Sequence, residues 1–182
     1  MFKKYPRTCL LSLGPRVCQT LQHFRFEHQN IDDDCQNRFD ASDDSTMRLA
    51  EACPGLKDVQ IQGATKLTDG AVWAFLANCP LLTRLEVSSH YKRKIRLEGG
   101  FFTSLQHRVD LATELEILRV DGNVPYGGTN RFATAMRALS KARETLLIEI
   151  SHTSEDSQYY WGDGRSYFMT VSDDKFKKGR KL

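Results

Sequence analysis

The sequence predicts an α/β solenoid, with a curved parallel sheet on the concave side and helices on the convex side. Three observations predict this fold: a short apolar pattern that recurs along the chain, helix-like segments between its copies, and two matching helix ends. We expect about four to five repeats over residues 1–151, and an aromatic C-terminal cap with a basic tail over residues 152–182.

The recurring pattern has apolar residues at positions i, i+3 and i+5 and predicts one short strand per copy. Its starting positions are separated by 35, 26, 33 and 30 residues, so the second interval is the bare unit and the others carry insertions. The copies are Leu21/Phe24/Phe26, Leu56/Val59/Ile61, Leu82/Leu85/Val87 and Leu115/Leu118/Val120, with a weaker copy at Thr145/Ile148/Ile150.

Four helices are expected between the strands. In the bare unit, Thr68 or Asp69 is suited to cap a helix. Proline lacks an amide donor and disfavours helical geometry in the residue before it, so Cys79-Pro80 ends that helix. One unit earlier, Asp44 or Ser45 is suited as a cap, and Cys53-Pro54 is the matching end. The apolar residues at helical spacing are Val72, Phe75 and Leu76; Met47, Leu49 and Ala50; Phe101, Phe102, Leu105 and Val109; and Phe132, Ala135, Met136, Leu139 and Ala142.

Residues 53–87 resemble the cysteine-containing leucine-rich repeat of F-box proteins and their antagonists. Leu67-Thr68-Asp69-Gly70 and Cys79-Pro80 carry most of the resemblance, whereas Ala64 stands where the family has its first repeat cysteine. The resemblance implies a leucine-rich-repeat solenoid that selects protein substrates for an SCF-type ubiquitin ligase, or a related adaptor, without catalysis. We expect no F-box, because about 20 residues precede the first predicted strand and an F-box needs roughly 40.

Composition favours one soluble domain and limits the classes of partner. Of the 182 residues, 40% are apolar and 27% charged, and no apolar run approaches the ~20 residues that cross a bilayer. Five cysteines without a CxxC pair predict reduced thiols in a cytoplasmic or nuclear protein. The net charge of +3 depends on five basic residues among the last eight, so the body is near −2 and is not expected to bind nucleic acid.

Side chains alternate along a strand, so the residues between the apolar positions should face away from the helices and stack in rows. We expect this concave face to bind a protein partner. Its predicted binding residues form two rows: the first contains His23, Asp58, Arg84, Ile117 and Leu147, and the central row contains Arg25, Gln60, Glu86, Arg119 and Glu149. A third row contains Glu27, Gln62, Ser88, Asp121 and Ser151. Pairing among these charges for solubility explains the central row as well as recognition does. Ile117 and Leu147 favour recognition, since two neighbouring apolar side chains on a polar face form a small anchor.

The remaining motifs have simple structural interpretations. Cys53 and Cys79 occupy equivalent positions and are expected to pack in the core, and the five histidines have no ligand or catalytic spacing. We therefore predict no metal, cofactor or catalytic residue. The acidic insertion at about residues 30–44 lacks the glycine and glutamate of a calcium loop and should be solvated.

The sequence thus predicts a monomeric, non-enzymatic interaction scaffold. Two alternatives stay open: a nucleic-acid-associated protein that uses the basic tail, and a small hydrolytic enzyme. The tail at residues 175–182 is interpreted as a nuclear address, a contact for nucleic acid or acidic lipid, or a solvated chain end.

Overall fold

The computed structural model describes residues 14–27, 41–64, 66–89, 95, 97–121, 131–153, 166–172 and 175–181, and from residue 151 onward the backbone alone. Most of the predicted acidic insertion and the aromatic residues Tyr159, Tyr160 and Trp161 lie outside these ranges. In the described part, strands and helices alternate along the chain, as the sequence predicted.

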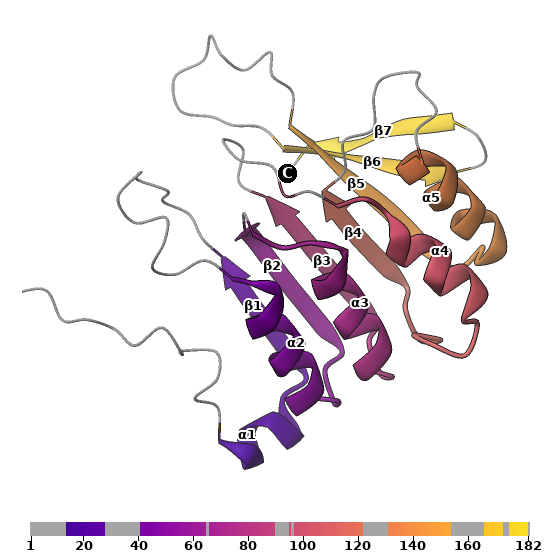
Figure 1. Ribbon diagram of the computed structural model, residues 1–182. Coiled ribbons are helices and arrows are strands. Elements are labelled where there is room, and N and C mark those ends of the chain that lie inside the picture. The colour runs from indigo at the N-terminus through magenta and orange to yellow at the C-terminus, as the bar shows by residue number, and fades with distance from the viewer. Residues whose placement is uncertain are drawn as a thin grey trace, which may run out of the picture.

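A seven-stranded sheet runs in sequence order from β1 to β7. Its first five strands are parallel: β1 (His23–Glu27), β2 (Asp58–Ala64), β3 (Arg84–Ser89), β4 (Ile117–Asp121) and β5 (Leu147–Thr153). The chain crosses between them through helices α2 (Asp43–Ala52), α3 (Asp69–Asn78), α4 (Gly100–His107) and α5 (Arg131–Ala142), and a short α1 (Pro15–Thr20) precedes β1. The helices lie on one face of the sheet (Figure 1). The α/β class and the parallel five-strand arrangement are therefore confirmed.

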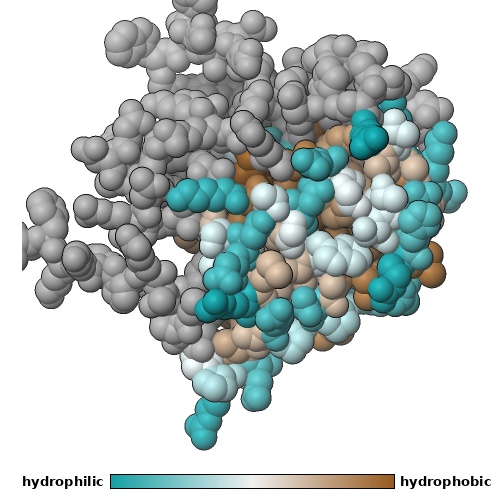
Figure 2. All heavy atoms as spheres, in the orientation of Figure 1, coloured by the Kyte–Doolittle hydropathy of each residue, from teal (hydrophilic) through white to brown (hydrophobic). Residues whose placement is uncertain are grey.

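The core lies between this helix layer and the sheet. The middle apolar position of the predicted pattern pairs in register across four strands, from Val59 through Leu85 and Leu118 to Ile148, and all four residues are fully buried. Phe75, Phe102 and Met136 and other helix residues meet them from the opposite side. From the helix side, polar and apolar side chains are interspersed on the surface (Figure 2). Among the described residues, no helix is long and apolar enough to cross a membrane.

One predicted helix start and one predicted helix end need correction. The cap of α2 is Ser42, whose hydroxyl accepts from Ser45 N at 3.4 Å while Ser45 Oγ accepts from Ser42 N at 3.0 Å. This capping box places Asp43 and Asp44 in the first helical turn rather than in the acidic insertion. Val109 lies beyond the end of α4 and is 75% exposed, because α4 ends at His107.

The weak fifth copy of the pattern is displaced by one residue. Leu56, Leu82 and Leu115 each donate a backbone hydrogen bond that closes the turn before a strand, and in the fifth copy the corresponding bond is made by Leu146, not Thr145. Leu146 is buried and Thr145 is exposed. The turn between α5 and β5 therefore brings a leucine to the repeated core position that the spacing assigned to Thr145.

Side chains at the two ends of the helices connect neighbouring units. The first residue of α3, Asp69, accepts from the backbone N–H groups of Glu98, Gly99 and Gly100 at 2.9, 3.2 and 2.6 Å, where α4 begins. Asp43, the first residue of α2, contacts Thr68 in the same way, with its carboxylate 2.8 Å from Thr68 N. Each carboxylate thus satisfies donors at the start of the next helix, which have no partner inside that helix.

At the opposite helix ends, the residue after the helix reaches back to the preceding unit. The Cys79 thiol lies 3.8 and 3.7 Å from the carbonyl oxygens of Ala50 and Cys53. Arg143 takes the equivalent place after α5 and donates to the carbonyls of Leu105, Arg108, Leu111 and Ala112. Sequence reasoning did not identify this role of Arg143. Cysteine stands at the equivalent position after α2 and α3, and an arginine does not resemble it in size, charge or polarity.

The segment after β5 extends the sheet with antiparallel strands β6 (Ser166–Ser172) and β7 (Lys175–Lys181). The basic tail was not expected to be a strand, yet its backbone forms the last strand of the sheet. Lysine-rich edge strands resist pairing with other chains, so a basic β7 suits that position.

Candidate protein-binding face

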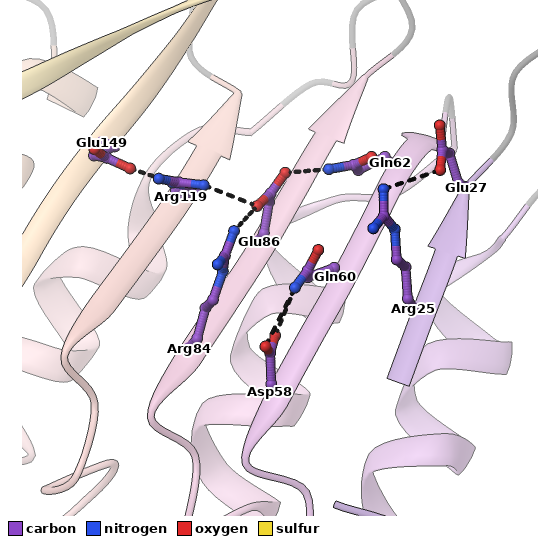
Figure 3. A network of polar contacts seen from close by, with 9 residues as sticks. All are labelled: Arg25, Glu27, Asp58, Gln60, Gln62, Arg84, Glu86, Arg119 and Glu149. Carbon is purple, nitrogen blue, oxygen red and sulfur yellow. Dashed lines mark hydrogen bonds and ion pairs between the residues drawn. The ribbon is translucent and has the colours of Figure 1, made fainter. Parts of the chain in front are cut away.

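The strand register brings the predicted binding residues together in rows. His23, Asp58, Arg84, Ile117 and Leu147 pair successively across β1 to β5, and Arg25, Gln60, Glu86, Arg119 and Glu149 do the same two residues further along. In both rows these residues alternate along the strands with the apolar ones that pack against the helices. Figure 3 shows the polar and charged members of the rows from Arg25 to Glu149 on the face opposite the helices. We call this surface, made of both rows, the open face.

Glu86 is the centre of a hydrogen-bonded network on the open face. One carboxylate oxygen accepts from Arg84 Nη2 at 2.8 Å and lies 3.4 Å from Arg119 Nη1, and the other accepts from Gln62 Nε2 at 2.5 Å. Arg119 also donates through Nε to Glu149. Figure 3 shows Arg84 and Arg119 converging on Glu86 from two sides. The network therefore spans β2 to β5.

The network buries its central carboxylate. The Glu86 side chain is only 2% exposed, so the expectation that this residue is a surface contact is wrong. Three donors surround it and exclude water. The alternating charges of the central row do attract one another, as predicted, but at low exposure this attraction is screened less than in a surface pair.

Electrostatics keep Glu86 ionised despite its burial. Burial opposes ionisation, but the hydrogen bonds from Arg84 and Gln62 and the charges of Arg84 and Arg119 outweigh it, so the pKa of Glu86 lies below its ordinary value of 4.5. Burial likewise disfavours the charged form of Arg119, yet the bonds and charges of Glu149 and Glu86 raise its pKa above the ordinary value. The network is charged and internally paired at neutral pH.

Away from Glu86, the polar side chains pair within single strands. Arg25 lies 3.1 Å from Glu27 in β1, and the Gln60 amide donates to both carboxylate oxygens of Asp58 at 3.0 and 3.2 Å in β2. Arg25 is 62% exposed. This end of the open face is accessible to a partner.

The apolar pair predicted as an anchor lies at the other end. Ile117 and Leu147 are direct register partners on β4 and β5. Ile117 is partly buried and Leu147 is 37% exposed. The pair is flanked by Arg84 in its own row and by Arg119 and Glu149 in the next.

Two residues of the third row support the site, although they were not among the predicted binding residues. Gln62 donates to Glu86, as described above. Asp121 is buried and accepts from the backbone N–H of Ser89 at 3.2 Å and from the Ser89 hydroxyl. Their signal in the sequence is position alone: both follow a central-row residue by two in the same strand.

The cysteines behave as core residues. Burial raises the pKa of the Cys79 thiol to about 12, and burial together with a hydrogen bond to Cys18 raises that of Cys53 to about 12. Both therefore stay protonated at neutral pH, whereas a nucleophile or metal ligand must be a thiolate. In the described ranges, no cluster of three His, Cys, Asp or Glu side chains could hold a metal ion. Cys9 and Cys35 lie outside those ranges.

Comparisons with known proteins add no further assignment. No family model, curated protein or solved structure matches the chain.

Proposed function

We propose that this chain is a leucine-rich-repeat solenoid that binds another protein on its open face and carries out no chemistry itself. One observation supports this above all: five parallel strands in continuous register present two complete rows of side chains on the face without helices. A sheet of this kind has the width to hold a polypeptide, and repeat proteins bind partners along such surfaces.

The test compares capture by matched variants of the full chain. Leu147→Asp and Arg25→Glu alter the two accessible ends of the open face without breaking the Glu86 network. Val109→Asp introduces the same change at a turn after α4 and serves as the control. Partners captured by the unaltered chain should be lost from the two open-face variants and retained by the control, with all variants keeping their melting temperature. Equal capture by all four proteins would refute the proposal.

We further propose that the captured partner is a ubiquitination substrate or a subunit of an SCF-type ligase. This step rests only on the resemblance of residues 53–87 to the repeats of F-box proteins. Quantitative mass spectrometry of the captured proteins tests it separately. If the proteins captured through the open face include no ligase subunit and no ubiquitin conjugate, the ligase role is rejected and the binding function stands.

A second candidate is nucleic-acid association, favoured by the placement of five basic residues in the last strand, β7. Phosphate contacts make affinity fall steeply with salt, so binding of the chain to a 20-base DNA duplex at several salt concentrations measures this role. Lys177→Gln/Lys178→Gln is the suitable variant, because it lowers the charge and leaves the strand in place. Binding that is equally tight with and without these lysines would reject the candidate.

A further inference from the structure

We propose that Arg84, Ile117 and Leu147 form a subsite for a peptide in which a carboxylate stands beside an aliphatic side chain. This inference deepens the proposed function and depends on it. The carboxylate would come from an aspartate, a glutamate or a chain terminus, and the aliphatic side chain would lie on Ile117 and Leu147.

The first step concerns the unused donors of Arg84. A guanidinium has five N–H donors, and within the described residues Arg84 uses one group, Nη2, to bond Glu86 at 2.8 Å. Its Nε is buried without a hydrogen-bond partner. The side chain as a whole is 28% exposed. Arg84 is therefore partly exposed as a side chain and, within the described residues, bonds a protein partner through Nη2 alone, while its unpartnered Nε is itself buried.

The second step concerns position. Arg84 pairs in register with Ile117, and Ile117 pairs with Leu147. Neighbouring strands lie about 4.8 Å apart, so the three side chains follow one another across β3, β4 and β5. A peptide lying across the strands meets one cation and then a two-residue apolar surface. The spacing suits adjacent or next-but-one residues of an extended chain.

The third step concerns charge. Two acidic groups beside the subsite are already paired with arginines, because Glu86 accepts from Arg84 and Arg119 and Glu149 is bound by Arg119. Asp58 is the register neighbour of Arg84 on the side away from Ile117, and it keeps its charge because both of its oxygens accept from the neutral Gln60 amide. A carboxylate approaching from the Ile117 side therefore faces Arg84 rather than an unpaired acid. A basic peptide bound in the same place would bring a second positive charge next to Arg84, and this repulsion disfavours its binding.

The experiment uses the full chain and a phage library of random 12-residue peptides as the probe. Enriched peptides are synthesised with a fluorophore, and affinities are measured by fluorescence polarisation for the unaltered chain and its variants. We expect the enriched set to carry Asp or Glu within two positions of Leu, Ile, Val or Met. Replacing that acid by its amide should weaken binding to the unaltered chain and have little effect on Arg84→Gln.

The variants have matched controls. Arg84→Gln and Leu147→Thr should each weaken binding by about tenfold or more, which corresponds to about 1.4 kcal/mol. Arg48→Gln removes the same charge from an exposed position on α2, away from the open face. Val109→Thr alters an exposed apolar residue on a turn, and both variants should stay within about twofold. Arg84→Lys keeps the charge with a different donor geometry and should fall between. Melting temperatures establish that each variant is folded.

Two failures are distinguishable. Peptides that lose affinity with Leu147→Thr but not with Arg84→Gln, or that lack the acid, overturn this subsite and leave a binding face in place. Peptides whose affinity no open-face variant changes, or a library without any binder, overturn the subsite; if protein capture is also indifferent to those variants, the proposed function fails with it.

Discussion

Replacing Arg143 by alanine should destabilise the fold more than the loss of any exposed charge. Its guanidinium donates to the carbonyls of Leu105, Arg108, Leu111 and Ala112 at 2.9 to 3.2 Å, which lie where α4 ends and the chain turns towards β4. Burial lowers the pKa of Arg143 below its ordinary value, but arginine remains charged in proteins. One cation thus holds the end of one unit to the next.

The magnitude follows from those contacts. A hydrogen bond to a charged group contributes about 1.5–3 kcal/mol, although bonds made by one side chain do not add and partly exposed carbonyls regain water. We therefore expect Arg143→Ala to lower the free energy of unfolding by about 2–4 kcal/mol. For a domain of this size, that loss corresponds to a melting temperature about 4–16 °C lower.

Urea unfolding followed by far-UV circular dichroism measures this loss. Arg48→Ala is the matched control, because Arg48 is exposed and its ion pair with Asp44 within α2 contributes about 0.3–0.5 kcal/mol. Arg143→Lys keeps the charge but loses the planar set of donors, so it should lie between the two. If Arg143→Ala cost no more than Arg48→Ala, the inference that Arg143 joins the last two repeats would be wrong.

Four further predictions concern other contacts. Asp69→Ala leaves three backbone N–H groups at the start of α4 without their acceptor, so it should lower the free energy of unfolding by about 1–3 kcal/mol in the same urea assay. Asp110→Ala, in an exposed pair with Arg108, should lower it by less than about 1 kcal/mol. The pKa of Glu86 is lower in the folded than in the unfolded chain, so its contribution is present above about pH 4.5 and is lost as pH falls through the folded value. The stability difference between the unaltered chain and Glu86→Gln should accordingly shrink below about pH 4.5, and a constant difference from pH 7 to 3 would refute it. Cys53 and Cys79 should resist alkylation at pH 8 until urea unfolds the chain, as read by mass spectrometry of each site; rapid native labelling of either would contradict their burial. Leu146→Ala should cost about 2–4 kcal/mol and Thr145→Ala under about 0.5, and the reverse order would restore the position that the spacing assigned.

The strand register was the most predictable feature. Apolar residues at i, i+3 and i+5 locate each strand in the sequence, and the alternation of side chains along a strand then determines which residues share a face. The pairs Gln60 with Glu86 and Arg119 with Glu149 follow from that counting alone and are confirmed. A one-residue slip would have moved each apolar set to the wrong face, so the pattern determines the register strongly.

Features that depend on three-dimensional contacts were harder to predict. Ser42 caps α2 because its side chain meets Ser45, while Asp44 and Ser45 have equally suitable chemistry at the wrong place. Burial of Glu86 requires donors from β2, β3 and β4 to converge, which no single segment encodes. The spacing likewise assigned Thr145 to the core because it cannot detect that the connection from α5 to β5 is one residue shorter than those from α2 to β2 and from α3 to β3.

The internal pairing of the central row bears on how a partner would bind. A ligand that competed for Glu86 would have to break bonds already made by two arginines and an amide, and would leave a buried charge without a partner. Self-pairing and recognition therefore divide the open face between them: the network from Gln62 to Glu149 holds the strands in register, and the side chains around it remain for contact. Affinity should consequently concentrate at Leu147 and the exposed Arg25, which lie outside the network, and at Arg84, a partly exposed member of the network that bonds Glu86 through Nη2 alone.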